Sequence, residues 1–180
     1  MRHPVIPALL IALFGWQAAA WYLRLPRAAA PANGMETADL RPLQGLTLQA
    51  ADGSRHAWPA ITNGLVGLLF PSPDPAANRR ALPRVQDAWA QLERAGRPLR
   101  VVLCDIAPTA AEQDAFLQDF KPPWPAVPAG EERLRRAGLA PPAAERPQLI
   151  LFDARGRLVT RRGVDDILRM GADAWEAWKP

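Results

Sequence analysis

Residues 65–83 read Leu-Val-Gly-Leu-Leu-Phe-Pro-Ser-Pro-Asp-Pro-Ala-Ala-Asn-Arg-Arg-Ala-Leu-Pro and combine an apolar run, a proline-rich loop and the first turns of a helix. The apolar run Leu65–Phe70 has the length and composition of a strand that is buried on both faces. The following helix should span Ala76–Ala95, with a kink at Pro83. One face of that helix is apolar and should cover the strand, and its residues are Val85, Ala88, Trp89 and Leu92.

Strands and helices alternate along the rest of the chain. Strands are expected at Leu46–Ala50, His56–Ile61, Leu99–Ile106, Gln148–Phe152 and Leu158–Thr160. Further helices are expected from a Thr109/Glu112 capping box to Phe120, at Glu131–Ala137 and at Val164–Met170. This order predicts an α/β domain over residues 40–180, with a mixed central sheet that opens with an N-terminal β-hairpin.

The N-terminus carries an uncharged stretch, Pro4–Leu23. A helix of about twenty residues spans the roughly 30 Å core of a bilayer, so residues 1–23 predict one transmembrane helix in contact with membrane lipid. Residues 24–39 are rich in Ala and Pro and read as a linker. A cleaved signal peptide is the alternative, because Ala18–Ala20 offers a small-x-small cleavage pattern.

Composition excludes several classes of site. The net charge is +4, but the arginine clusters are short and separated and no nucleic-acid-binding motif accompanies them, so no nucleic-acid partner is expected. The two histidines, His3 and His56, lie outside any ligand spacing, and neither a metal site nor a cofactor is expected. The single cysteine, Cys104, lies within an apolar strand and should be buried and inert.

The stretch Phe70–Pro83 resembles the active-site segment of thioredoxin-type redox proteins. In that family a strand ends in Phe, a Trp-Cys-x-x-Cys-Arg run opens a helix, and Pro follows five residues after the second Cys. With Pro83 on that Pro, Arg79 falls on the Arg, Asp74 on the Trp, and Pro75 and Asn78 on the two cysteines. Disulfide exchange needs a thiolate, which neither Pro nor Asn supplies.

A second stretch, residues 146–163, reads Arg-Pro-Gln-Leu-Ile-Leu-Phe-Asp-Ala-Arg-Gly-Arg-Leu-Val-Thr-Arg-Arg-Gly and resembles the C-terminal hairpin of tryparedoxin and nucleoredoxin proteins. The resemblance implies a thioredoxin-like fold of the redoxin branch. It also implies a cis-proline at Pro147, preceded by Arg146 at a position that contacts substrate in active members. With its anchor, the architecture is similar to bacterial membrane-tethered thioredoxins of cytochrome maturation, which implies an inner-membrane protein with a periplasmic domain.

Two functions of different classes remain open. The first is a redox-inactive binding module that serves as an accessory or assembly subunit of a membrane complex, whether anchored or, after cleavage, secreted. The second is a thiol oxidoreductase or peroxidase that acts through Cys104.

Several side chains carry alternative roles. Asp74 and Asn78 are expected to cap the helix or, alternatively, to hold an anion there. Partner-binding candidates are Pro73, Ala76, Arg146, Pro147, Trp175 and Trp178; the two tryptophans could instead pack against the sheet.

Overall fold

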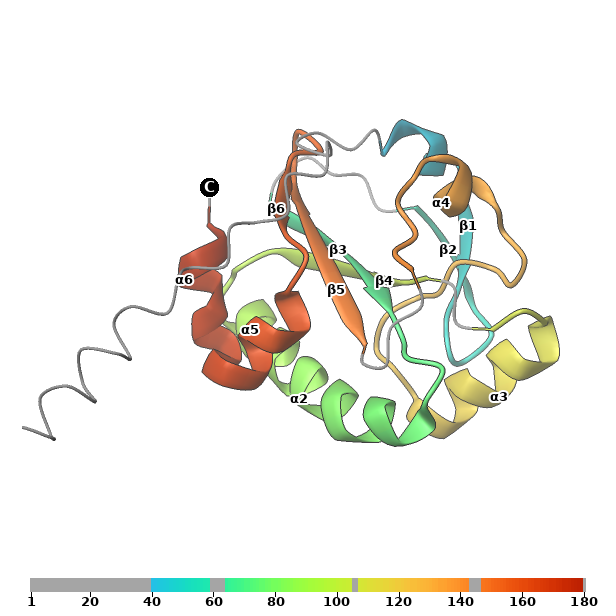
Figure 1. The fold of residues 1–180 in the computed structure, drawn as a ribbon, viewed down its shortest axis with the longest axis horizontal. Helices are drawn as coiled ribbons and strands as arrows, with labels where there is room; N and C mark the ends of the chain where they lie inside the picture. Colours follow the sequence, from blue (N-terminus) through green and yellow to red (C-terminus); the bar gives the residue numbers. More distant parts are fainter. Residues whose placement is uncertain (1–39, 59–63, 105–106, 143–146, 180) are drawn as a thin grey trace, which may run out of the picture. The chain divides into compact units, whose positions relative to one another are not determined.

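The computed structural model describes residues 40–58, 64–104, 107–142 and 147–179 (Figure 1). The strands are β1 (Thr47–Gln49), β2 (Arg55–Ala57), β3 (Leu65–Phe70), β4 (Leu99–Leu103), β5 (Gln148–Asp153) and β6 (Leu158–Thr160). The helices are η1 (Arg41–Leu43), α2 (Pro75–Arg94), α3 (Ala110–Phe120), α4 (Arg133–Arg136), α5 (Gly163–Met170), η2 (Gly171–Ala174) and α6 (Trp175–Trp178).

The central sheet has the strand order β4-β3-β5-β6. β3 runs parallel to β4 and antiparallel to β5, and β5 pairs antiparallel with β6, so the predicted mixed sheet is confirmed. β1 and β2 form the predicted N-terminal hairpin, and Gly53 in its turn has a φ of +82° that favours glycine.

The segment around Ala126 connects the hairpin to the central sheet. Its N–H donates to the carbonyl of Gln49 at 2.7 Å, and its carbonyl accepts from the N–H of Gln49 at 2.8 Å. On the other side, Leu103 accepts from the N–H of Val127 at 2.8 Å and donates to the carbonyl of Pro125 at 2.9 Å. The short segment Pro125–Val127 therefore continues the hydrogen bonding from β1 to β4.

All six residues of β3 are buried, because both faces of the sheet are covered. Leu65 and Leu69 face a core that is shared with α2 and α5, whereas Val66, Leu68 and Phe70 face a core that is shared with η1, β1 and α4. Figure 1 shows α2 and α5 together on one side of β3 and β5, and α4 with the hairpin on the other. This layering places the N-terminus of α2 at the end of the central strand.

Most predicted bounds agree with the structure to within a few residues. The N-cap predicted at Thr109 is confirmed, since the hydroxyl oxygen of Thr109 accepts from the N–H of Glu112 at 3.3 Å, and the hydroxyl donates to the Glu112 carboxylate at 2.7 Å. β2 ends at Ala57 and β4 at Leu103, earlier than predicted, and residues 59–63 and 105–106 lie outside the described residues. α2 continues through Pro83 as one helix, and the kink predicted there stays a prediction.

The predicted anchor and linker, residues 1–39, also lie outside the described residues. Within the part of the chain that the structure describes, no helix has the length and hydropathy needed to cross a bilayer.

Candidate functional site

The start of α2 corresponds to the helix start that carries the redox centre in thioredoxin-type proteins. In this chain the side chain of Asp74 caps it. Asp74 is the N-cap of α2, and its Oδ1 accepts a hydrogen bond from the N–H of Ala76 at 2.9 Å. Pro75, in the place of the first cysteine, occupies the first helical position, where its missing N–H costs nothing. The Asp74 carboxylate thus occupies the position that an anion would need, and the capping role predicted for Asp74 is confirmed.

Asn78, in the place of the second cysteine, is buried and closes the loop that precedes α2. Only 2% of Asn78 is exposed. Its Oδ1 accepts from the N–H of Ser72 at 2.8 Å, and its Nδ2 donates to the carbonyl of Ser72 at 2.8 Å. The capping role predicted for Asn78 is therefore wrong, because its amide satisfies both backbone groups of a buried loop residue instead.

Most of the remaining positions of this segment are exposed, whereas Ala77 is buried. Arg79 forms an ion pair with Asp119 at 3.1 Å, which joins α2 to the end of α3. Pro73 and Ala76 are exposed, so this part of the predicted partner surface is accessible, and Pro83 is also exposed. We call Pro73–Asn78, with Arg79 and Pro83, the former active-site segment.

A groove of about 420 Å³ lies beside this segment, between α2 and α5. The α2 wall carries Ala77, Arg80, Ala81 and Arg84. The α5 wall carries Val164, Asp165 and Leu168, and Pro147 also lines the groove. The sequence pattern did not predict this groove, although two arginines one helical turn apart beside two alanines stand in the sequence.

Pro147 is buried immediately before β5 and belongs to the same groove. Arg146 lies outside the described residues, so the cis form predicted for the Arg146–Pro147 bond and the partner role predicted for Arg146 stay predictions.

Cys104 is fully buried, as predicted. Its Sγ lies 3.5 Å from the carbonyl oxygen of Val102, and its N–H donates to the carbonyl of Leu69 at 2.9 Å. Cys104 belongs to the core shared with the hairpin and α4, whereas Ala81 and Val164 of the groove belong to the core on the other face of the sheet. The only thiol of the chain therefore does not reach the groove.

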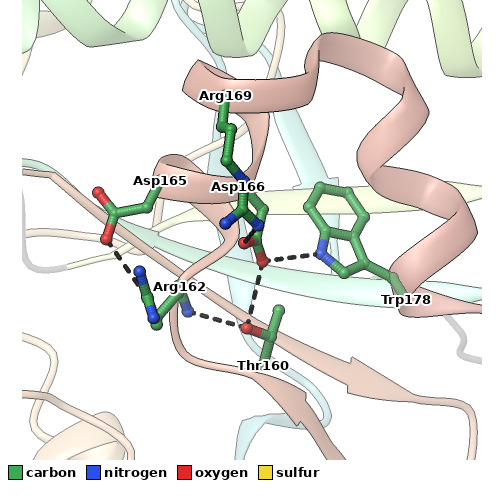
Figure 2. A network of polar contacts seen from close by, with 6 residues as sticks. All are labelled: Thr160, Arg162, Asp165, Asp166, Arg169 and Trp178. Carbon is green, nitrogen blue, oxygen red and sulfur yellow. Dashed lines mark hydrogen bonds and ion pairs between the residues drawn. The ribbon is translucent and has the colours of Figure 1, made fainter. Parts of the chain in front are cut away.

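The two C-terminal tryptophans pack against the core of the domain, which was one of the two roles considered for them. Trp178 is 2% exposed, and its Nε1 donates to Oδ2 of Asp166 at 3.1 Å (Figure 2). Asp166 also accepts from Arg169 at 3.1 Å and from the hydroxyl of Thr160 at 3.5 Å. Trp175 is half-buried against the same core. The prediction of Trp178 as an accessible partner anchor is wrong, because this network holds its indole inside the domain.

The hairpin of β5 and β6 contains a buried carboxylate, that of Asp153. Asp153 accepts hydrogen bonds from the N–H groups of Arg155 and Arg157, each at 2.9 Å, and from Nε of Arg157 at 2.6 Å. Desolvation raises the pKa of Asp153, but the Arg157 hydrogen bonds and charge outweigh it, so the net pKa lies below its usual value. Asp153 is a structural turn residue and lies outside the groove.

Among the described residues, no three His, Cys, Asp or Glu side chains gather in a way that could hold a metal ion. His56 contacts the hydroxyl of Ser54 at 2.9 Å.

No protein-family model and no curated protein sequence matches the chain. Solved structures do resemble it. Tryparedoxin I from Crithidia fasciculata matches with a TM-score of 0.60 at 22% identity, over 78% of this chain and 97% of that protein.

Two further structures support the same likeness. Thioredoxin from Wuchereria bancrofti matches with a TM-score of 0.57 at 20% identity, over 69% of this chain and 87% of that one. The bacterioferritin comigratory protein of Xanthomonas campestris matches with a TM-score of 0.56 at 15% identity, over 82% and 99%. At these identities the likeness establishes architecture alone, and the chain therefore has a thioredoxin-like fold of the redoxin type.

Proposed function

We propose that this chain is a thioredoxin-like binding module without thiol redox activity, and that it serves as an accessory or assembly subunit of a membrane protein complex. The observation that carries this proposal is the hydrogen bonding at the former active-site segment. Asp74 caps α2, Pro75 starts it, and both amide atoms of Asn78 bind Ser72. These three side chains thus hold the backbone in place, and none of them can supply the thiolate that disulfide exchange needs.

The burial of Cys104 supports the same proposal. A thiolate that attacks a disulfide or a peroxide must meet its substrate, and reactive cysteines are at least partly exposed. Cys104 is fully buried on the far side of the sheet from the groove. An enzyme that acts through Cys104 would require the end of β4 to separate from the sheet, because the thiol has no exposed surface.

The groove supplies the binding surface. Its small apolar residues Ala77, Ala81 and Val164 leave space that larger side chains would fill, and the exposed residues Pro73 and Ala76 lie next to it in sequence. We propose that a partner segment in extended conformation occupies this groove and contacts the former active-site segment.

The proposed location rests on the uncharged stretch Pro4–Leu23 together with the resemblance to bacterial membrane-tethered thioredoxins. As a single-pass helix it would hold the domain at a bacterial inner membrane, on the periplasmic side. A mature N-terminus within residues 18–28, found by sequencing the native protein, would favour the secreted form instead.

Two matched variants test the binding proposal. Ala76→Glu and Ala111→Glu introduce the same charge at the second position of α2 and of α3, and both positions are exposed. The helix dipole favours Glu equally at both, so neither change should disturb folding. Pull-downs from detergent-solubilised native membranes should lose the partner complex with Ala76→Glu and retain it with Ala111→Glu. Retention with both variants would contradict the proposed surface.

A second assay tests the absence of redox activity. The purified protein and its Cys104→Ser variant should give the same background rate in disulfide reduction and in peroxide consumption. Turnover that disappears with Cys104→Ser would overturn the binding module and establish the enzyme.

A further inference from the structure

The two walls of the groove differ in chemistry. The α2 wall presents Arg80 and Arg84, one helical turn apart, whereas the α5 wall presents the apolar side chains of Val164 and Leu168. Leu168 is only half-buried, so its side chain is available to a ligand. A ligand that fits both walls must be acidic along one edge and apolar along the other.

The positive charge of the α2 wall is available for binding. Arg80 is 73% exposed, and its guanidinium lies 3.8 Å from Asp74, a distance at which an exposed pair contributes little. Within the described residues, no carboxylate lies within ion-pair distance of the exposed Arg84. The opposite wall carries one carboxylate, Asp165, so the groove lining of two arginines and one aspartate keeps a net charge of +1.

The spacing of the arginines selects the conformation of the ligand. Side chains at i and i+4 of a helix start about 5–6 Å apart. In an extended strand, residues i and i+2 point to the same side and are about 6.6 Å apart, because each residue rises about 3.3 Å. Arginine side chains are long enough to absorb the difference, and each guanidinium can bind one carboxylate through two hydrogen bonds.

The residue between the two acidic ones points to the opposite side of an extended strand. There it would meet the half-buried side chain of Leu168 on the α5 wall. We infer that the groove selects an extended peptide segment of the pattern acidic–apolar–acidic. This inference rests on the proposed function and specifies the chemistry of the partner segment.

The test measures binding of fluorescently labelled peptides to the full-length protein in a neutral detergent, by anisotropy at low salt. The probe is acetyl-Gly-Glu-Leu-Glu-Gly-Ser-amide. Its controls replace both Glu by Gln, both Glu by Lys, or Leu by Ser. We expect the Glu-Leu-Glu peptide to bind at least about tenfold more tightly than the Gln peptide, which corresponds to about 1.4 kcal/mol. The Ser peptide should bind more weakly than the Leu peptide.

Charge reversal tests the assignment to the α2 wall. The double variant Arg80→Glu/Arg84→Glu should lose the acidic peptide and bind the Lys peptide. The control double variant Arg55→Glu/Arg100→Glu has the same change in net charge, at exposed positions outside the groove, and should bind the acidic peptide normally. Equal binding of the Glu and Gln peptides would overturn the inference. Equal loss in both double variants would also overturn it, because attraction would then come from overall charge.

The outcomes separate this inference from the proposed function. If the acidic peptide does not bind while Ala76→Glu still releases the native complex, the pattern is wrong and the binding module stands. If the acidic peptide binds while Cys104 supports turnover, the proposed redox inactivity is wrong and the groove specificity stands.

Discussion

Two buried amide side chains occupy equivalent positions in two helices. One forms hydrogen bonds through both of its polar atoms, and the other forms none among the described residues. Asn78 is the fourth residue of α2, after the N-cap Asp74, and Gln113 is the fourth residue of α3, after the N-cap Thr109. Asn78 is 2% exposed and Gln113 is 1% exposed. Both amide atoms of Asn78 bind Ser72, whereas neither amide atom of Gln113 has a partner among the described residues.

The difference lies in the chain that precedes each helix. The loop before α2 brings the N–H and the carbonyl of Ser72 against the Asn78 amide, so one side chain satisfies two buried backbone groups. Burial of an amide alone therefore does not indicate a stabilising role. The comparison predicts that removing these two amides changes stability in opposite directions.

The largest effect is expected for Asn78→Ala. This change removes both hydrogen bonds that the Asn78 amide forms with the backbone of Ser72 and should lower the free energy of unfolding by about 2–4 kcal/mol. Urea unfolding at neutral pH measures it. A loss below about 0.5 kcal/mol would mean that water replaces the amide easily, and the assigned role of Asn78 would be wrong.

Asp153→Asn tests a third buried polar side chain, this time a charged one. The folded-state pKa of Asp153 is depressed, so its contribution is present above the unfolded pKa of about 3.9 and is lost as the pH falls through the folded value. The substitution should cost about 1–2 kcal/mol at pH 7, because the charge-assisted bond to Arg157 weakens. Unfolding curves at pH 7 and pH 3 should show this cost shrinking in acid. A cost that grows in acid would contradict the depressed pKa.

Gln113→Met should act in the opposite direction to Asn78→Ala. Methionine has a similar length and no group that needs a partner, so the variant should gain about 1 kcal/mol of stability. The same urea titration measures it. A loss of stability comparable to that of Asn78→Ala would show that the Gln113 amide does form hydrogen bonds.

The effects of the two N-caps should be no larger than that of Gln113→Met, and they should be alike. Asp74→Ala and Thr109→Ala each remove one side-chain bond to a helix N–H, and each should cost about 1 kcal/mol. Thermal melts of the two variants side by side would sharpen the comparison. Equal losses would leave Asn78 and Gln113 as the source of the difference between the two helix starts.

The sequence predicted local features well. β3 was predicted over Leu65–Phe70 and has those bounds, because a short apolar run between Gly and Pro fixes both ends of a strand. The N-cap at Thr109 depends on residues three apart and was also found. The burial of Cys104 followed from its apolar neighbours.

Features that depend on distant contacts were missed. The groove requires α2 and α5, which are far apart in sequence, to pack side by side. The role of Asn78 depends on the path of the loop at Ser72, and the burial of Trp178 depends on Asp166 of another helix. Helical periodicity identifies the apolar face of an element, but not the element that will cover it.

The bridging segment at Ala126 has a consequence for the order of folding. β1 is among the first parts of the domain to be synthesised, yet its outer hydrogen bonds go to a residue that follows it by more than seventy positions. The ends of such a long loop meet late, because closure costs entropy before any contact compensates for it. The hairpin nearest the N-terminus should therefore dock only after β4 and Pro125–Val127 are in place. The first strand of this domain to leave the ribosome is expected to be among the last to join the sheet.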